Sequence, residues 1–312
     1  MREFRGHSIL VTGAGGYIGS ALVKAIAAGD PCNLILLDSC EQNLFEISRC
    51  TLGEAILGSV TDAALLDVLF ERFRPSIVFH AAAFKHVPLL EKNPLAAIHN
   101  NSIGTYTLAR AISRHDPARL VLVSTDKAVN PCSFLGISKR IAELTVVSLS
   151  TRLHPMNAIR LGNVIGSTGS VIPIFRRQIA AGEPLTVTHP DATRYFISLE
   201  NAVEAILAAG DADCAGRILL PDLGAPVRIE DVARSLMGGA KLPIRYIGLR
   251  PGDKLSENLT FANEERERTA GPLAVIRTPA PDPATIDAAI ECLRTARTRE
   301  ELLAAARTLV CL

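Results

Sequence analysis

A glycine-rich turn near the N-terminus constrains the fold of this chain more than any other feature. Its sequence is VTGAGGYIGSAL, in which Gly13, Gly16 and Gly19 stand three residues apart. The turn follows an apolar strand pattern that begins at Ser8, and it opens a helical pattern. Such glycines permit a tight turn, close approach of the backbone to a pyrophosphate and tight packing of helix on strand. The turn therefore predicts a dinucleotide site beside a helix N-terminus.

Alternating strand and helix patterns continue through the first half of the chain. Units of this length form a parallel sheet that helices cover on both faces. After Leu161, Gly, Pro and Thr become frequent, which is typical of a smaller, loop-rich lobe. We expect a Rossmann-like, doubly wound domain in residues 1–161 and a substrate-binding lobe in residues 162–312, interleaved with the first domain. The expected strands after the first are 34–38, 76–80, 119–124 and 157–161.

Composition excludes several classes of protein. The formal net charge of +1 gives no reason to expect nucleic acid or an anionic membrane as a partner. No apolar run reaches the roughly 18–20 residues of a membrane span, and a strand pattern at Ser8 leaves no room for a signal peptide. Seven scattered cysteines without CxxC are typical of reduced thiols. His80 and His86 lack an acidic partner at a supporting spacing. We therefore expect a cytoplasmic protein with no integral membrane segment and no metal.

Two further segments are expected to complete the cofactor site. Asp38 ends the second strand, where a carboxylate can accept hydrogen bonds from ribose hydroxyls and would repel a 2′-phosphate, which favours NAD over NADP. The alternative is that Asp38 caps the next helix. The small alanines after the strand expected over 76–80 would let the backbone approach the cofactor. The expected cofactor-binding residues are Gly13, Gly16, Tyr17, Ile18, Asp38, Ala81, Ala82, Ala83 and Lys139.

Six ordered segments along the chain carry the remaining signals: VTGAGGYIGS, HAAAFKHVPLLEKNP, STDKAVNP, RLGNVIGSTGSVIPIF, TVTHPDATRYF and LRPGDKLSE. Together they resemble the extended short-chain dehydrogenase/reductase superfamily. More narrowly, they resemble the bacterial polysaccharide-biosynthesis branch of nucleotide-sugar 4,6-dehydratases. Long members of that branch carry an N-terminal membrane region, and this chain resembles their catalytic part alone. The resemblance implies a UDP-N-acetylglucosamine substrate and a homo-oligomer.

One active-site position departs from the superfamily pattern. A tyrosine usually stands four residues before the active-site lysine, and counting back from Lys139 gives Leu135. A leucine can neither give nor take a proton. The family resembled here includes subgroups with methionine at this position, so Leu135 resembles a further apolar variant of that subgroup trait.

The segment STDK supplies other candidates for the chemistry. By resemblance, Asp126 is the acid for the sugar C6 hydroxyl and Lys127 is the base for C5. A lysine base must be neutral, which requires desolvation or a nearby positive charge such as that of Lys139. Thr125 can hydrogen-bond to the C4 oxygen, and Lys139 would hold the nicotinamide ribose. The alternative is a capping turn followed by an exposed lysine. Whether Thr125, Asp126 or water deprotonates the C4 hydroxyl stays open.

Polar residues elsewhere are candidates for binding a nucleotide sugar. Arg194 and Arg250 are the expected diphosphate clamps, because guanidinium forks match phosphate oxygens, although surface ion pairs are the commoner role of arginine. These residues favour an NAD-dependent nucleotide-sugar 4,6-dehydratase. A C4 epimerase and a non-catalytic NAD-binding regulator are the alternatives. The expected substrate-binding residues are Lys85, His86, Asn163, Ser170, Val171, Arg194 and Arg250.

Overall fold

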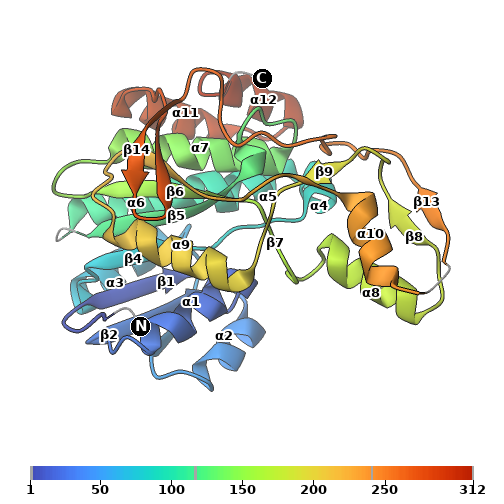
Figure 1. The fold of residues 1–312 in the computed structure, drawn as a ribbon. Coiled ribbons are helices and arrows are strands. Elements are labelled where there is room, and N and C mark those ends of the chain that lie inside the picture. Colours follow the sequence, from blue (N-terminus) through green and yellow to red (C-terminus); the bar gives the residue numbers. More distant parts are fainter. Residues whose placement is uncertain (1–2, 116–117, 240–241, 311–312) are drawn as a thin grey trace.

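A nine-stranded sheet forms the centre of the molecule, with helices on both faces (Figure 1). The structure is a computed structural model that describes residues 3–115, 118–239 and 242–310. The strand order is β14-β15-β11-β6-β5-β4-β1-β2-β3. Neighbouring strands from β11 to β3 are parallel, whereas β15 and β14 pair antiparallel at one edge. These strands are β1 (Ser8–Thr12), β2 (Asn33–Asp38), β3 (Glu54–Leu57), β4 (Ile77–His80), β5 (Arg119–Thr125), β6 (Met156–Leu161), β11 (Arg217–Pro221), β14 (Glu265–Ala270) and β15 (Leu273–Arg277).

The strand order places a ligand crevice beside the glycine-rich turn. The chain winds outward from β1 to β3 and then crosses back to β4 on the other side of β1. Ligands of doubly wound sheets bind beyond the carboxyl ends of the strands at such a switch point. The Rossmann-like α/β fold expected from the sequence is confirmed.

Two apolar layers fix the helices to the sheet. One layer packs residues of α1, α2 and α9 against one face, for example Leu22, Leu44 and Ile206. The other packs α3, α6 and α7 against the opposite face, for example Phe70 and Leu108. The helices are α1 (Tyr17–Ala27), α2 (Glu41–Ser48), α3 (Ala63–Phe73), α6 (Gly104–Arg114), α7 (Phe134–Leu149) and α9 (Leu199–Asp211).

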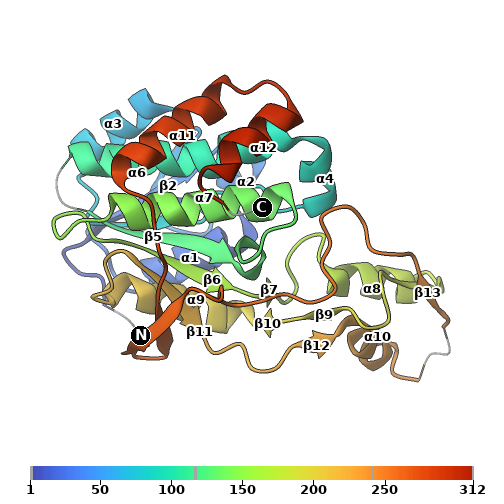
Figure 2. The same cartoon turned by 90° about the horizontal axis from the view of Figure 1, so that it is seen from above.

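The C-terminal helices add an outer layer above α7 (Figures 1 and 2). A third apolar cluster joins them to α4, α5 and the outer side of α7, so that Leu135 shares a cluster with Ile286 and Leu302. Within the described ranges, every helix falls short of the length and hydropathy that a membrane span needs. The elements of this layer are α4 (Val87–Lys92), α5 (Pro94–Ala97), the π-helical η1 (Ile98–Ile103), α11 (Pro283–Thr295) and α12 (Arg299–Arg307).

A smaller lobe projects from the carboxyl edge of the sheet, as Figure 2 shows. It has a small core of its own, which includes Phe175, Leu185 and Ile229. The chain enters this lobe after β6, returns to the sheet with β11, and passes through the lobe again before β14. The elements that leave the sheet are β7 (Asn163–Val164), α8 (Val171–Ala180), β8 (Leu185–Val187), β9 (Thr193–Arg194), β10 (Phe196–Ile197), β12 (Val227–Arg228), α10 (Ile229–Met237) and β13 (Ile244–Tyr246).

Candidate functional site

The glycine-rich turn brings three segments into close backbone contact. Gly13 has a φ of 68°, and a Cβ on it would lie 2.6 Å from the backbone N of Ala82. A Cβ on Gly19 would lie 1.9 Å from the carbonyl oxygen of Gly13. Gly16 is the N-cap of α1, without a side-chain cap, and it lines both cavities described below. The turn therefore leaves the first N–H groups of α1 open to an anionic ligand.

The smaller cavity lies beside Asp38, at the end of β2. Its volume is about 210 Å³, and Asp38, Gly58, Ser59 and Ala82 are among the residues that line it. The two carboxylate oxygens of Asp38 accept hydrogen bonds from the backbone N–H groups of Gly15 and Cys40, both at 2.9 Å. Cys40, and not Asp38, is the N-cap of α2. Each oxygen keeps acceptor capacity for a ribose hydroxyl.

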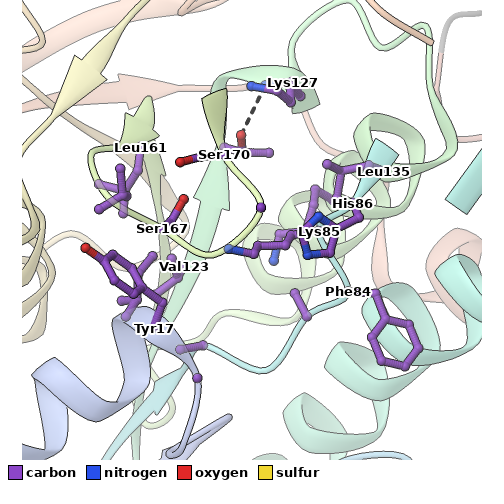
Figure 3. Close-up of a pocket in the computed structure, with 18 of the residues that line it drawn as sticks. Tyr17, Phe84, Lys85, His86, Val123, Lys127, Leu135, Leu161, Ser167 and Ser170 are labelled. Atoms are coloured by element: carbon purple, nitrogen blue, oxygen red, sulfur yellow. Dashed lines mark hydrogen bonds between the residues drawn. The ribbon is translucent and has the colours of Figure 1, made fainter. Parts of the chain in front are cut away.

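The larger cavity, of about 740 Å³, lies at the carboxyl ends of β1, β4, β5 and β6 (Figure 3). In that view Lys85, His86 and Leu135 lie on one side and Tyr17 and Leu161 on the other. The Tyr17 hydroxyl donates to the carbonyl of Ile165 at 2.8 Å, which ties α1 to the loop that enters the small lobe. The predicted residues that line the cavity are Gly16, Tyr17, Ile18, Ala81, Ala83, Lys85, His86, Thr125, Lys127, Lys139, Asn163 and Ser170.

The turn that the sequence predicts to be catalytic, residues 125–129 and called the catalytic turn below, follows β5 and includes the short 3₁₀ helix η2 (Asp126–Ala128). Lys127 Nζ donates to Asp126 Oδ1 at 2.9 Å and to Asn163 Oδ1 at 3.0 Å. The Thr125 hydroxyl also donates to Asp126 Oδ1, at 2.9 Å. Asp126 is fully buried and is absent from the cavity lining, and its Oδ2 has no partner among the described residues. The side chains of Thr125 and Lys127, which donate to the Asp126 carboxyl group, therefore lie between it and the cavity.

Lys139 lies deep in the same cavity, one turn of α7 after Leu135. It is 3% exposed, and its ammonium makes no hydrogen bond to a described residue. Burial lowers the pKa of Lys139 to about 8, against the opposing charge of Glu143. Burial and then the charge of Lys139 lower the pKa of His80 to about 3, so His80 is neutral between the hydroxyls of Thr12 and Thr105.

Leu135 faces the cavity where the resembled superfamily carries its tyrosine. It is 6% exposed and packs in the cluster that the C-terminal helices cover. Lys85 and His86 bring nitrogen atoms to the same side. Burial lowers the pKa of both groups, and the charge of Lys85 lowers that of His86 further.

The structure does not bring all predicted substrate residues to the cavity. Val171 begins α8 and is absent from the lining. Arg194 donates to the carbonyls of Thr193, Lys254 and Leu255, and Arg250 pairs with Asp253 at 2.8 Å. Neither arginine lines the cavity, so their role as diphosphate clamps stays a prediction. Among the described residues, no group of three His, Cys, Asp or Glu side chains could hold a metal ion.

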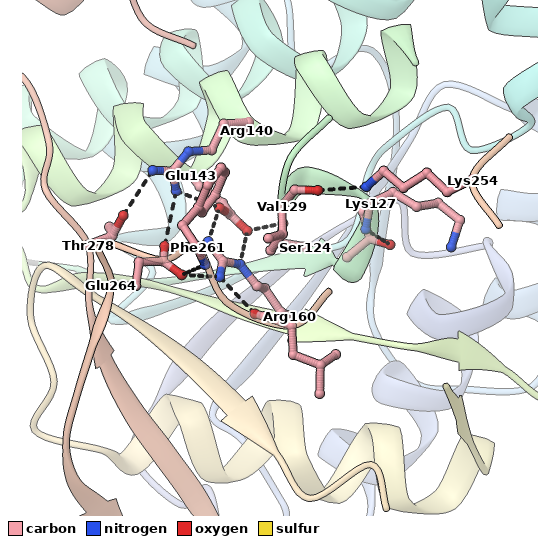
Figure 4. A network of polar contacts seen from close by, with 12 residues as sticks. Ser124, Lys127, Val129, Arg140, Glu143, Arg160, Lys254, Phe261, Glu264 and Thr278 are labelled. Atoms are coloured by element: carbon pink, nitrogen blue, oxygen red, sulfur yellow. Dashed lines mark hydrogen bonds and ion pairs between the residues drawn. The ribbon is translucent and has the colours of Figure 1, made fainter. Parts of the chain in front are cut away.

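Sequence reasoning missed two sets of charged residues next to the catalytic turn. Lys254 and Glu257, from the LRPGDKLSE segment, lie against it: Glu257 Oε1 is 3.7 Å from Lys127 Nζ. Behind the turn, the Ser124 hydroxyl donates to Glu143, which is paired with the buried Arg160 (Figure 4). The LRPGDKLSE segment was a sequence signal for the first set, and Arg160, which opens the RLGNVIGSTGSVIPIF segment, was one for the second.

The strand order and the helix layers define an α/β protein, and the glycine-rich turn lies at the switch point beside both cavities, where the sequence predicts a dinucleotide site. The family of polysaccharide biosynthesis proteins matches residues 9–278. The chain belongs to this family.

Relatives include proteins of two named activities. The chain is 42% identical to the capsular polysaccharide biosynthesis protein CapD of Staphylococcus aureus over 84% of its own length and 46% of CapD, so it spans about half of that relative. It is 32% identical to a UDP-N-acetylglucosamine 4,6-dehydratase (inverting) of Campylobacter jejuni, covering 84% of this chain and 79% of that one. It is 33% identical to a UDP-glucose 4-epimerase of Rickettsia canadensis, covering 82% of this chain and 78% of that one.

Solved structures share the fold. Pen of Bacillus thuringiensis superposes with a TM-score of 0.81 at 25% identity, covering 89% of this chain and 88% of that one. A double mutant of the dTDP-glucose 4,6-dehydratase DesIV of Streptomyces venezuelae was solved with NAD bound. It superposes with a TM-score of 0.74 at 22% identity, covering 92% of this chain and 95% of that one.

Proposed function

We propose that this protein dehydrates a UDP-N-acetylhexosamine, with UDP-N-acetylglucosamine as the first candidate, to a 4-keto-6-deoxy sugar nucleotide. The observation that carries the proposal is the juxtaposition of Asp126 and Lys127. A hydrogen bond of 2.9 Å joins the two side chains, and Lys127 lines the large cavity. An acid and a base this close can serve two adjacent carbon atoms of one sugar.

The residues around both cavities fit NAD. The open N-terminus of α1 would take the pyrophosphate, Asp38 the adenosine ribose and Lys139 the nicotinamide ribose. Bound NAD would accept hydride from C4 of the sugar and return it to C6. Because the carboxylate of Asp38 repels a 2′-phosphate, NAD is the proposed cofactor rather than NADP.

The protein's own groups then move protons. Thr125 hydrogen-bonds to the C4 oxygen and passes the C4 hydroxyl proton to water as hydride leaves C4, and the positive charge of Lys139 favours negative charge on that oxygen. The Lys127 amine removes the C5 proton that the C4 ketone has acidified. Asp126 supplies the proton with which the C6 hydroxyl leaves as water, and it regains a proton from solvent. The protonated Lys127 returns its proton to C5 as hydride reaches C6. Leu135 takes no part in proton transfer, so the absent tyrosine does not stop this sequence of steps.

A nucleotide-sugar C4 epimerase is the second candidate, because relatives of similar identity carry that name. An epimerase oxidises and reduces C4 without an acid and a base for C5 and C6. NMR of the product from UDP-N-acetylglucosamine distinguishes the two: a 4-keto-6-deoxy sugar supports dehydration, and a galacto product supports epimerisation. No product in the presence of NAD would favour a non-catalytic regulator. We also propose a homo-oligomer in the cytoplasm, which light scattering and cell fractionation would test.

A further inference from the structure

A segment from the C-terminal half of the chain lies across the catalytic turn and presents a buried carboxylate to it. This segment, residues 250–257, is called the strap below. Its Glu257 is 7% exposed. Glu257 Oε1 lies 3.7 Å from Lys127 Nζ, and Glu257 Oε2 lies 3.0 Å from Lys254 Nζ. Lys254 Nζ in turn donates to the carbonyl of Val129 at 2.6 Å, as Figure 4 shows.

Several contacts hold the strap in this position. Arg194 donates to the strap carbonyls of Lys254 at 2.8 Å and Leu255 at 3.2 Å. A Cβ on Gly252 would lie 2.9 Å from Cβ of Ser133, so the strap backbone packs directly on the residue that caps α7. The position of Glu257 is therefore set by the packing of the strap and does not depend on Lys127 alone.

The charges around Lys127 are unevenly placed. Asp126 Oδ1 and Glu257 Oε1 are the negative groups that face its amine, at 2.9 and 3.7 Å. Asn163 adds a neutral acceptor, whereas Lys85, His86 and Lys139 line the same cavity with nitrogen atoms. A buried carboxylate is costly unless cations compensate it. Lys254 alone could compensate the negative charge of Glu257 through Oε2. The other oxygen, Oε1, faces the amine of Lys127, which is the base in the proposed reaction.

We propose that Glu257 is a positioning residue for this reaction. It holds the Lys127 amine against Asp126 and Asn163 and sets the pH at which that amine gives up its proton. This role rests on the proposed function in one respect, because Lys127 is the base in that reaction. The contact itself can be tested without turnover.

The test is the reactivity of the Lys127 amine toward acetic anhydride, read by peptide mass spectrometry across a pH series. Only the unprotonated amine reacts, and the Lys127 side chain is 20% exposed, so the reagent can reach it. A unit charge at 3.7 Å, even with the dielectric constant of water, changes proton affinity about 6-fold. At a pH where the wild-type amine is mostly protonated, Glu257→Gln should therefore be acetylated about 6-fold faster or more.

Two matched variants separate charge from loosening of the strap. Glu257→Asp keeps the charge and should retain most of the wild-type pH dependence. Asp253→Asn breaks the ion pair of 2.8 Å between Asp253 and Arg250, which lies in the same strap but away from Lys127. It should leave the midpoint pH of Lys127 acetylation unchanged. Greater exposure of the Lys127 amine raises the acetylation rate at every pH. Loss of the Glu257 charge instead moves the midpoint of the pH dependence to lower pH.

A Glu257→Gln midpoint equal to that of wild type, or an equal shift in Asp253→Asn, would overturn the inference. If the wild-type protein forms no 4-keto-6-deoxy product, the proposed function fails, but the labelling result still decides whether Glu257 governs Lys127. If the product forms, the rising limb of turnover with pH should move to lower pH in Glu257→Gln, as the labelling midpoint does.

Discussion

Replacing Arg160 with methionine should remove a large part of the stability of the sheet beneath the catalytic turn. The Arg160 side chain is fully buried, and Figure 4 shows it between two carboxylates. It donates to Glu143 at 2.9 and 2.9 Å and to Glu264 at 2.6 and 2.7 Å. Methionine would fill part of the space but would leave both carboxylates buried with fewer partners.

The expected loss follows from this geometry. Removing one partner of a buried ion pair costs about 3–5 kcal/mol, because the remaining charge stays uncompensated. Arg140 remains 3.1 Å from Glu143 and 3.5 Å from Glu264, so we expect the lower end, about 3 kcal/mol. The matched control is Arg217→Met, which breaks a partly exposed pair with Glu267 and should cost less than about 1 kcal/mol.

Urea unfolding followed by circular dichroism measures both losses at pH 7 and at lower pH. Burial pushes the pKa of Glu143 up, but the charge and hydrogen bonds of Arg160 outweigh burial and hold the pKa below its usual value. A lowered carboxyl pKa contributes stability above the unfolded value of about 4.3, and this contribution is lost as the pH falls through the folded-state pKa. The difference in free energy of unfolding between wild type and Arg160→Met should therefore be greatest at neutral pH and should become smaller below about pH 4.3. A loss no larger than that of Arg217→Met would refute this reasoning.

Three further predictions concern the cofactor and the missing tyrosine. Titration should show tighter binding of NAD than of NADP; tighter NADP binding would reject the role of Asp38. Gly16→Val should weaken NAD binding, because Gly16 lines both cavities and a Cβ there would lie 3.2 Å from the carbonyl oxygen of Gly13, within the turn proposed to hold the pyrophosphate; unchanged affinity would place the pyrophosphate elsewhere. Leu135→Met roughly conserves volume and should retain most of the dehydratase activity and cost less than about 1.5 kcal/mol in stability; a folded variant without turnover would show that the shape of leucine matters.

Local patterns were sufficient to predict the elements around the proposed cofactor site. The strands expected over 34–38 and 157–161 are present as β2 and β6. Short continuous apolar runs and the glycine turn are local signals for these elements. They also placed Thr125 and Lys127 at the carboxyl end of a strand, and therefore at the crevice.

Contacts between distant segments could not be predicted in this way. Glu257 meets Lys127 only because the strap returns to the sheet after crossing the small lobe, and no periodicity encodes that return. Arg194 was expected to bind a diphosphate, yet in the structure it donates to the carbonyls of Lys254 and Leu255. An arginine in a Gly/Pro-rich loop can serve a ligand or a backbone, and the direction of the loop decides between them.

Exchange of the C5 hydrogen tests the central claim most directly, because the claim is that Lys127 removes this proton. UDP-N-acetylglucosamine is incubated with NAD and the enzyme in deuterated water, and recovered substrate and product are analysed by mass spectrometry. Variants are included only after NAD titration and thermal unfolding show that they are folded. Asp126→Asn removes the acid, so it should lose product but can retain C5 exchange, since proton removal can precede departure of the hydroxyl. Lys127→Met should lose both, with product formation falling about 10²–10⁴-fold. C5 exchange at the wild-type rate in folded Lys127→Met would contradict the account.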